Sequence, residues 1–293
     1  MQNQNIQWFP GHMTKTKRKI QSCLKLIDLV VEIIDARIPI SSSNPDLAEI
    51  IQNKPKLVLL NKCDKANRSA TDSWVSYYNN KGVKAIPVDC KSGRGLNKFV
   101  PSVREILAEK FEAQKAKGLK NPILRVMIVG IPNVGKSSFI NRISKQTRAK
   151  VEDRPGVTRG NQWYTVSKDL EMLDTPGVLW PKFEDEKVGR HLAFIGAIKD
   201  NILDIELLAM DFLELMRDHP TEEFLARFKL KAEDIKDLES FEILELVGKK
   251  RGMLISGGEI NTERAANLIF DEYRDGKFGY ITLEYPEDCN ELA

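Results

Sequence analysis

Residues 124–138 read LRVMIVGIPNVGKSS, an apolar run followed by a glycine-rich turn and a lysine. Gly130 to Ser137 match the pattern G-x-x-x-x-G-K-[ST], and the run before them, Leu124 to Val129, has the length and apolar character of a buried strand. Backbone N–H groups of such a turn surround phosphates, and the helix that follows adds positive potential at its N-terminus. The pattern in this context predicts a nucleotide phosphate site rather than a chance turn before a buried helix.

The residues of this loop that we expect to bind nucleotide are Gly130, Asn133, Val134, Gly135, Lys136, Ser137 and Ser138. Lys136 should reach the β and γ oxygens and take part in catalysis, and Ser137 should place its hydroxyl on Mg²⁺. Asp174, in the segment DTPG that follows another apolar run, is expected to hold Mg²⁺ through water, and the N–H of Gly177 to face the γ-phosphate. Thr158 lies between these motifs, where a closing segment could add its hydroxyl to Mg²⁺.

A base-binding motif, N-K-x-D, stands at Asn61, Lys62, Cys63 and Asp64, directly after the apolar run Lys56 to Leu60. A carboxylate at Asp64 can accept hydrogen bonds from N1–H and N2–H₂ of guanine together, whereas adenine has a lone pair at N1. The Lys62 stem could cover the base plane, and Asn61 could tie this loop to the phosphate loop. Asp89, Cys90 and Lys91 end the next apolar run, where a backbone N–H can reach guanine O6.

Apolar runs of strand length alternate with amphipathic stretches through the first part of the chain, which predicts an α/β fold with a mostly parallel sheet. The expected strands are 29–34, 56–60, 85–88, 123–129, 162–166 and 170–173, the last two forming one antiparallel pair, and the expected helices are 45–52, 69–80, 96–117 and 136–145. Helical spacing without strands follows at 187–199, 205–216, 221–228 and 241–247. We therefore expect a nucleotide-binding domain over residues 1–182 and a smaller all-helical domain over residues 183–293.

Composition excludes several classes of protein. With 293 residues and 42% hydrophobic content, the chain can fill a core, and no apolar run approaches the ~20 residues of a membrane span. Lysines and arginines occupy the N-terminus where a signal segment would be apolar, which favours a cytoplasmic protein. The four cysteines form no C-x-x-C pair and the three histidines do not cluster near them, so we expect no zinc site.

The net charge of +3 conceals an asymmetry along the chain. Residues 1–205 carry +13, whereas residues 206–293 carry −10. Residues 1–27 contain five basic side chains and no acidic one, and residues 142–168 contain seven basic and two acidic ones. These two stretches could face a polyanion, although lysines often only solvate helix surfaces.

The base and phosphate motifs together resemble the translation-factor-related GTPases, in which Ser-Ala-Lys usually stands where this chain has Asp-Cys-Lys at 89–91. In ordinary members the phosphate motifs come first, but here Asn61 and Asp64 precede Gly130 and Asp174. The order is that of a circularly permuted P-loop GTPase domain. The segment after Gly177 then leads directly into the helical region, so nucleotide state could re-aim that region.

This order, with WFPGHM at 8–13, DARIP at 35–39, GIPNVGKS at 130–137 and LWPK at 179–182, closely resembles the ribosome biogenesis GTPase A (RbgA or YlqF) family. The resemblance implies a GTP-hydrolysing assembly factor that binds the precursor of the large (50S) ribosomal subunit in the GTP state and leaves on ribosome-stimulated hydrolysis to GDP. It also implies contacts with rRNA and ribosomal proteins, and an RNA-binding helical domain similar to the ANTAR fold.

Hydrolysis needs a group that orients water, and Leu179 stands where Ras-like enzymes have a glutamine. The resemblance assigns a catalytic role to His12; the alternative is that His12 and its aromatic neighbours cap a sheet edge. Similar GTPases use an asparagine at the position of Asn133 to help hold K⁺; the alternative is that Asn133 only satisfies the loop backbone.

Other interpretations stay open at this point. Gly248 to Gly252, GKKRG, could be a loop that contacts RNA phosphates, with Arg264 nearby, or could simply end a helix. The protein could be a nucleotide-gated scaffold in which turnover matters little, or a factor for the small subunit, although the modules usual in such factors are missing. Asp64 disfavours an ATPase.

Overall fold

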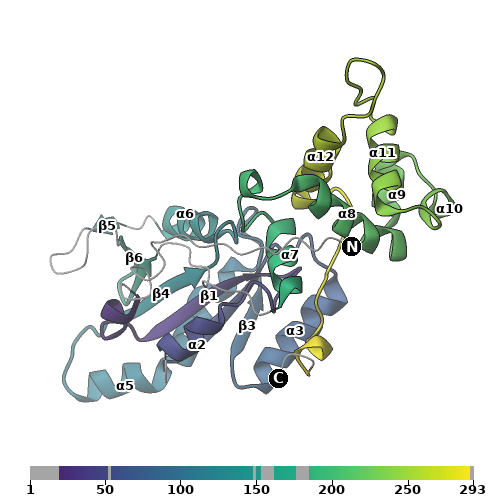
Figure 1. Cartoon of the computed structure of the whole chain (residues 1–293). Coiled ribbons are helices and arrows are strands. Elements are labelled where there is room, and N and C mark those ends of the chain that lie inside the picture. The colour runs from purple at the N-terminus through teal and green to yellow at the C-terminus, as the bar shows by residue number, and fades with distance from the viewer. Residues whose placement is uncertain (1–19, 52–53, 148–149, 153–161, 176–184, 291–293) are drawn as a thin grey trace. The chain divides into compact units, whose positions relative to one another are not determined.

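The structure, a computed structural model, describes residues 20–51, 54–147, 150–152, 162–175 and 185–290. These residues form two compact units (Figure 1). The first contains the described residues up to Thr175 and, in addition, the segment from Thr282 onward. The second is the helical stretch 185–281. In the part of the chain that is described, no helix has both the length and the apolar character needed to cross a membrane.

A mostly parallel sheet organises the first unit. Its strands are β1 (Leu29–Asp35), β2 (Lys56–Asn61), β3 (Lys84–Pro87), β4 (Leu124–Gly130), β5 (Lys150–Glu152), β6 (Trp163–Ser167) and β7 (Leu170–Asp174). Their order across the sheet is β3-β2-β1-β4-β7-β6-β5. Strands β1, β2, β3, β4 and β7 run parallel, so their carboxyl ends meet at one edge. Ligands of open α/β sheets bind at this edge, where the strand order reverses.

The strand predictions are confirmed, and each end lies within one residue of the predicted one. Strands buried on both faces read as unbroken apolar runs, and all seven residues of β1 are indeed buried. The prediction of a single antiparallel pair was wrong: β6 pairs antiparallel with β7 and also with β5. Strand β5 has three residues, too few for any period to appear in the sequence.

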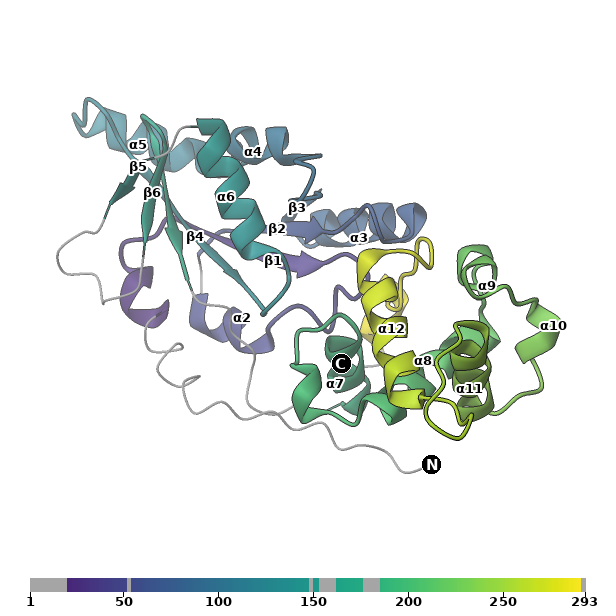
Figure 2. The ribbon, with the colours of Figure 1, turned by 90° about the horizontal axis from the view of Figure 1, so that it is seen from above.

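Helices cover both faces of the sheet. The first unit contains α2 (Pro45–Ile51), α3 (Arg68–Asn80), the 3-10 turn η1 (Leu96–Lys98), α4 (Phe99–Ile106), α5 (Ala108–Ala116) and α6 (Lys136–Thr147). Figure 2 shows α4 and α6 on the side of the sheet opposite α2. On that side the rings of Phe99 and Phe139 pack edge to face, 5.0 Å apart.

The single helix expected over residues 96–117 is divided in the structure. Leu107, at φ −102° and ψ 13°, separates α4 from α5. Helix α4 buries Phe99 and Val103 against the sheet, whereas α5 buries no residue. The sequence of α5, AEKFEAQKA, has no apolar stripe that would hold it on the sheet in line with α4.

The second unit is built of helices joined by loops, one of which contains an isolated β-bridge between Leu254 and Ile260. It contains α7 (Glu186–Phe194), η2 (Asp200–Ile202), α8 (Ile205–Asp218), α9 (Glu222–Phe228), α10 (Ala232–Ile235), α11 (Ser240–Lys250) and α12 (Thr262–Asp275). Its core is aromatic: Phe212 packs against Phe194, Phe270 and Tyr273 with ring centroids 4.7–5.8 Å apart. Polar side chains at Asp204, Thr221 and Asn261 cap the N-termini of α8, α9 and α12. The sequence predicted α8 and α9 but not α12.

The predicted range 183–293 assigned the last residues of the chain to the helical unit, but the segment from Thr282 belongs to the first unit. This segment packs on the first unit, where it forms the 3-10 turn η3 (Pro286–Asn290). The Glu284 carboxylate accepts hydrogen bonds from the backbone N–H groups of Ile40 (2.6 Å) and Ser41 (3.0 Å) and from the Ser41 hydroxyl. The indole N–H of Trp74 donates to the carbonyl of Glu284 at 2.9 Å. These contacts join residues that are far apart in the sequence, and no local sequence pattern predicts them.

Replacing Glu284 with alanine should lower the free energy of unfolding of the first unit. Glu284 is 3% exposed, and removal of its side chain takes this acceptor from the N–H groups of half-buried Ile40 and buried Ser41. Because each such group costs ~1–3 kcal/mol, we expect a loss of about 2–4 kcal/mol, measured by urea denaturation. Glu287→Ala, an exposed position of the same segment, is the matched control and should change stability by less than ~0.5 kcal/mol. Equal effects of the two changes would contradict the assigned role of Glu284.

Candidate nucleotide site

The phosphate loop connects the end of β4 to the start of α6. Asn133 and Gly135 have positive φ angles of 57° and 103°, which bend the backbone sharply. Gly130 is packed so closely that a Cβ atom there would lie 2.7 Å from the Ile33 carbonyl oxygen. The loop borders a hollow of about 450 Å³. Its lining residues are Ile131, Pro132, Asn133, Gly135, Lys136, Ser137 and Ser138.

Charged and hydroxyl groups line this hollow or contact its lining residues. The Lys136 ammonium lies 3.1 Å from Oδ1 of Asp174, the last residue of β7. Ser137 is exposed in the first turn of α6, and the Thr175 hydroxyl fixes the chain after Asp174 by donating to the Ile128 carbonyl at 2.7 Å. A serine hydroxyl and one carboxylate suit Mg²⁺, which keeps waters and takes the rest of its ligands from phosphates. Lys136, Ser137 and Asp174 therefore fit a magnesium nucleotide.

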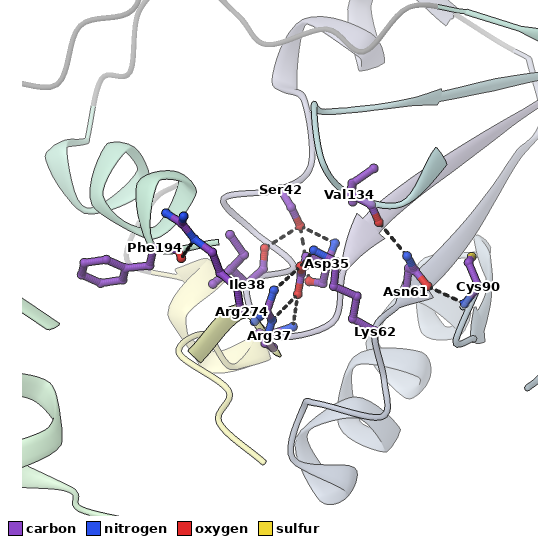
Figure 3. A network of polar contacts seen from close by, with 10 residues as sticks. All are labelled: Asp35, Arg37, Ile38, Ser42, Asn61, Lys62, Cys90, Val134, Phe194 and Arg274. Carbon is purple, nitrogen blue, oxygen red and sulfur yellow. Dashed lines mark hydrogen bonds and ion pairs between the residues drawn. The ribbon is translucent and has the colours of Figure 1, made fainter. Parts of the chain in front are cut away.

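Asn61 joins the base loop to the phosphate loop. Its amide Nδ2 donates to the Val134 carbonyl at 2.6 Å, and its Oδ1 accepts from the Cys90 N–H at 2.9 Å (Figure 3). The hydrogen bond expected between the base loop and the phosphate loop is thus present. Asn61 also contacts the loop at Asp89, Cys90 and Lys91, which is the third loop of the site. One buried side chain, 2% exposed, holds together three loops that come from β2, β3 and β4.

Asp64 has a carboxylate oxygen that accepts no hydrogen bond from the described residues. Its Oδ1 atom is buried and has no hydrogen-bond partner among the described residues. Buried polar atoms are seldom left in this state, because each costs free energy. A guanine base, with donors at N1 and N2, would supply the missing partner, so the base loop fits the nucleotide that the sequence predicted.

The loop at Asp89, Cys90 and Lys91 is closed by its own contacts. The Asp89 carboxylate accepts from the N–H groups of Lys91 (2.8 Å) and Ser92 (3.2 Å). Burial raises the pKa of the Cys90 thiol to about 12, so this thiol stays neutral. The N–H groups of Cys90 and Lys91 are already engaged with Asn61 and Asp89, and the group that reaches guanine O6 stays a prediction.

Sequence reasoning missed Arg142 and gave Asp35 no role. The Arg142 guanidinium, on α6, donates to the carbonyl oxygens of Lys91 (2.9 Å) and Ser92 and so holds the third loop against the phosphate-loop helix. Arg142 lies six residues beyond Lys136 with no recognisable motif around it. The segment DARIP at 35–39 contributed to the family resemblance, but the sequence alone suggested no chemical role for Asp35.

Three predicted site residues lie outside the described residues: His12, Thr158 and Gly177. Their roles stay predictions.

The basic segment 248–252 is not a loop. Gly248 to Lys250 form the last turn of α11, with Lys249 and Lys250 exposed. Arg251 follows at the end of the helix, and its Nη2 lies 3.2 Å from the buried Glu272 carboxylate, while its guanidinium stacks on the Phe228 ring. This arrangement favours the interpretation as a helix end, and among these residues it leaves Lys249 and Lys250 facing solvent.

The chain is similar to known GTPases. The sequence model of a family described as 50S ribosome-binding GTPase matches residues 125–249. A protein of Bacillus pumilus named ribosome biogenesis GTPase A is 48% identical over 96% of this chain and 99% of its own length. The protein of that name from Thermotoga maritima is 32% identical over 97% of this chain and 95% of its own length. Mouse mitochondrial ribosome-associated GTPase 1 is 31% identical over 94% and 89% of the two chains.

Solved structures of a Thermotoga maritima protein, YlqF, show the same fold. The GDP-bound form matches with a TM-score of 0.65 and 28% identity, over 92% of this chain and all of that one. The GNP-bound form matches with a TM-score of 0.63 over 93% and 99% of the two chains. Nearly full-length identity of 48%, together with base loops that precede the phosphate loop and meet it at Asn61, shows that this chain belongs to the ribosome biogenesis GTPase A family.

Proposed function

We propose that this GTPase assembles the large (50S) ribosomal subunit in the cytoplasm, binding its precursor in the GTP state and leaving when the ribosome stimulates hydrolysis. The observation that supports it best is the bridge at Asn61, which connects the base loop, with its unsatisfied Asp64 oxygen, to the phosphate loop. This geometry supports guanine-nucleotide binding by Asn61, Lys62, Asp64 and the phosphate loop. The names of the relatives support the ribosome as partner.

Charge distribution supports rRNA as part of that partner. The +13 charge of residues 1–205 belongs to the part of the chain that contains the nucleotide site, whereas residues 206–293 carry −10. Phosphate contacts by lysine and arginine supply most of the sequence-independent affinity for RNA. The proposal assigns rRNA mainly to the basic part and to exposed lysines such as Lys249 and Lys250, and basic ribosomal proteins to the acidic surface.

The proposal also explains why the partner would stimulate turnover. Leu179 offers no polar group to orient water, so hydrolysis without the ribosome should be slow. His12 is proposed to orient or deprotonate the water once the precursor positions the N-terminal segment. Lys136 stabilises the charge that develops on the phosphates, and a K⁺ ion next to Asn133 would add to it.

His12→Ala should remove the stimulation by the ribosome and leave nucleotide binding intact. We expect the GTPase rate with 50S subunits in KCl to fall by about 10²-fold, since a positioned general base contributes 10²–10⁴ in rate. His219→Ala, in the helical unit, is the matched control and should keep the stimulated rate. Rates are measured with 50S subunits, with 30S subunits and without either, and GDP affinity is measured for each variant.

The other interpretations appear as outcomes of the same experiment. Stimulation by 30S subunits alone would assign the protein to the small subunit. Stimulation that survives in His12→Ala would exclude the histidine. Normal 50S assembly in cells that carry a turnover-deficient His12→Ala protein would favour a nucleotide-gated scaffold. Replacement of KCl by NaCl tests the ion at Asn133, and an unchanged rate would remove K⁺ from the proposal.

A further inference from the structure

A buried acid lies next to the base loop, outside the residues assigned above. Asp35 ends β1 and is 0% exposed. In the register of the sheet it is the direct partner of Asn61, the first residue of the base loop. An ionised carboxylate at such depth needs compensation, because burial strongly disfavours its charge.

Arg37 makes most of the contacts that compensate this charge. Its Nε lies 2.9 Å from Oδ1 of Asp35 and its Nη2 2.8 Å from Oδ2, a two-point contact that also fixes the geometry. The backbone N–H of Arg37 adds a third hydrogen bond of 3.1 Å to Oδ1. Burial opposes ionisation, but Arg37 and Lys62 outweigh it and hold the pKa of Asp35 well below its ordinary value. The carboxylate is therefore charged at any physiological pH.

Lys62 brings a second cation to the same carboxylate. Its ammonium lies 3.0 Å from Oδ2 of Asp35, and its side chain is 22% exposed (Figure 3). The backbone at Lys62 has a φ of 59°, a left-handed conformation that lysine seldom adopts. Because Arg37 already makes three hydrogen bonds to Asp35, the second cation matters more for Lys62 than for Asp35: the contact fixes the end of a long, flexible side chain.

The loop that carries Asp35 is itself held in place. The Asp35 N–H donates to the Ser42 hydroxyl oxygen at 2.9 Å, and that hydroxyl donates to the Ile38 carbonyl at 2.6 Å. The C-terminal segment adds a contact from the Leu283 N–H to the Arg37 carbonyl at 2.8 Å. Several contacts therefore hold Asp35 in place, and those with Arg37 remain when the Ser42 hydroxyl is lost, so Asp35 can still fix the position of the Lys62 ammonium.

We propose that Asp35 is a positioning residue for the guanine base: it holds the Lys62 ammonium so that the lysine stem is already extended across the base plane when nucleotide enters. The inference rests on the proposed guanine site, in which Lys62 covers the base. Fixing a flexible side chain before binding removes an entropy cost of ~0.5–1.5 kcal/mol, which corresponds to about two- to tenfold in affinity. The role does not require Asp35 to touch the nucleotide.

The test measures GDP affinity by titration calorimetry for Asp35→Asn, Lys62→Met, the double variant and Lys62→Ala. Lys62→Met keeps a stem of similar length but removes the ammonium, and it lies at a partly exposed position that should fold normally. We expect Asp35→Asn and Lys62→Met each to weaken GDP binding about two- to tenfold. The double variant should be no weaker than either, because both changes remove the same contact. Lys62→Ala, which also loses the stem, should be weaker still.

Ser42→Ala provides the matched control for a loosened loop. It removes a hydrogen bond to the Asp35 backbone and leaves the ion pair with Lys62 in place. It should keep GDP affinity within about twofold, and thermal unfolding without nucleotide reports the structural damage of every variant. Asp35→Asn could fail to fold because it leaves the buried Arg37 charge uncompensated. In that case the double change Asp35→Asn with Arg37→Met, which removes the buried charge as well, replaces Asp35→Asn in the comparison with Lys62→Met.

Each outcome decides one question. Non-additive losses at Asp35 and Lys62, with Ser42→Ala unaffected, support the inference. Additive losses, or an equal loss in Ser42→Ala, overturn it and make Asp35 structural. If Lys62→Met and Lys62→Ala both bind GDP normally, Lys62 does not cover the base and the proposed guanine site itself is wrong. Normal GDP binding by Asp35→Asn alone would contradict only the role of Asp35.

Discussion

Asp64→Asn should lower GDP affinity by at least about 10²-fold and raise affinity for xanthosine diphosphate. The carboxylate can accept from both guanine N1–H and N2–H₂, whereas an asparagine amide turns one acceptor into a donor that faces the guanine amino group. A site built around such hydrogen bonds rejects an unmatched partner strongly. Xanthine carries a carbonyl oxygen at position 2, and the new N–H can donate to it. Competition titration with GDP, ADP and xanthosine diphosphate measures the change.

Asp72→Asn is the control for this experiment. Asp72 is exposed in the second turn of α3, eight residues further along, and the change removes the same charge outside the N-K-x-D motif. It should leave GDP affinity within about twofold. Weaker GDP binding without any gain for xanthosine diphosphate would mean that Asp64 supports the loop and does not select the base.

The selectivity of this site could be predicted from sequence because each loop carries a local pattern. Gly130 to Ser137 and Asn61 to Asp64 are short motifs that directly follow apolar runs, and parallel strands bring their carboxyl ends to one edge. Six strands were predicted to within one residue, since strands buried on both faces are continuous apolar runs in the sequence, whereas the three-residue strand β5 was missed. Chemistry and position were thus both encoded within stretches of about ten residues.

What the sequence did not reveal depends on contacts between distant residues. Glu284 binds the backbone of Ser41 from more than 200 positions away, and the Asp35–Lys62 pair spans two strands. Arg142 reaches the third loop across 50 residues. An acid or arginine of this kind looks like any other until the fold places its partner, so its role becomes visible only in the structure.

The division of the helix at Leu107 has a different origin. Helical propensity is high from Ser102 onward, and no proline or glycine between Ser102 and Lys117 would break a helix at Leu107. The break occurs where the apolar stripe of α4 ends, so the remaining turns have no surface to bury. Tertiary packing, rather than propensity, determined where the helix stops.

Gly135→Ala should abolish GDP binding, with an expected loss of at least about 10²-fold. The residue has a φ of 103°, in which an alanine is strained by ~1–2 kcal/mol. Its Cβ would also lie 2.2 Å from Nδ2 of Asn61, the atom that donates to Val134. The side chain that joins the base and phosphate loops would have to move, so both halves of the site would be displaced by one methyl group.

Gly118→Ala separates these two causes. Gly118 has a similar φ of 88°, but an added Cβ there meets nothing within 4 Å, so this variant bears only the backbone strain and should bind GDP normally. A second arm places Gly135→Ala in an Asn61→Ala background, where the collision is absent. If collision with Asn61 causes the loss, Gly135→Ala should weaken GDP binding far less in that background than in the natural protein. An equal loss in both backgrounds would instead assign the effect to the phosphate loop alone, and Asn61 would then have no part in transmitting it.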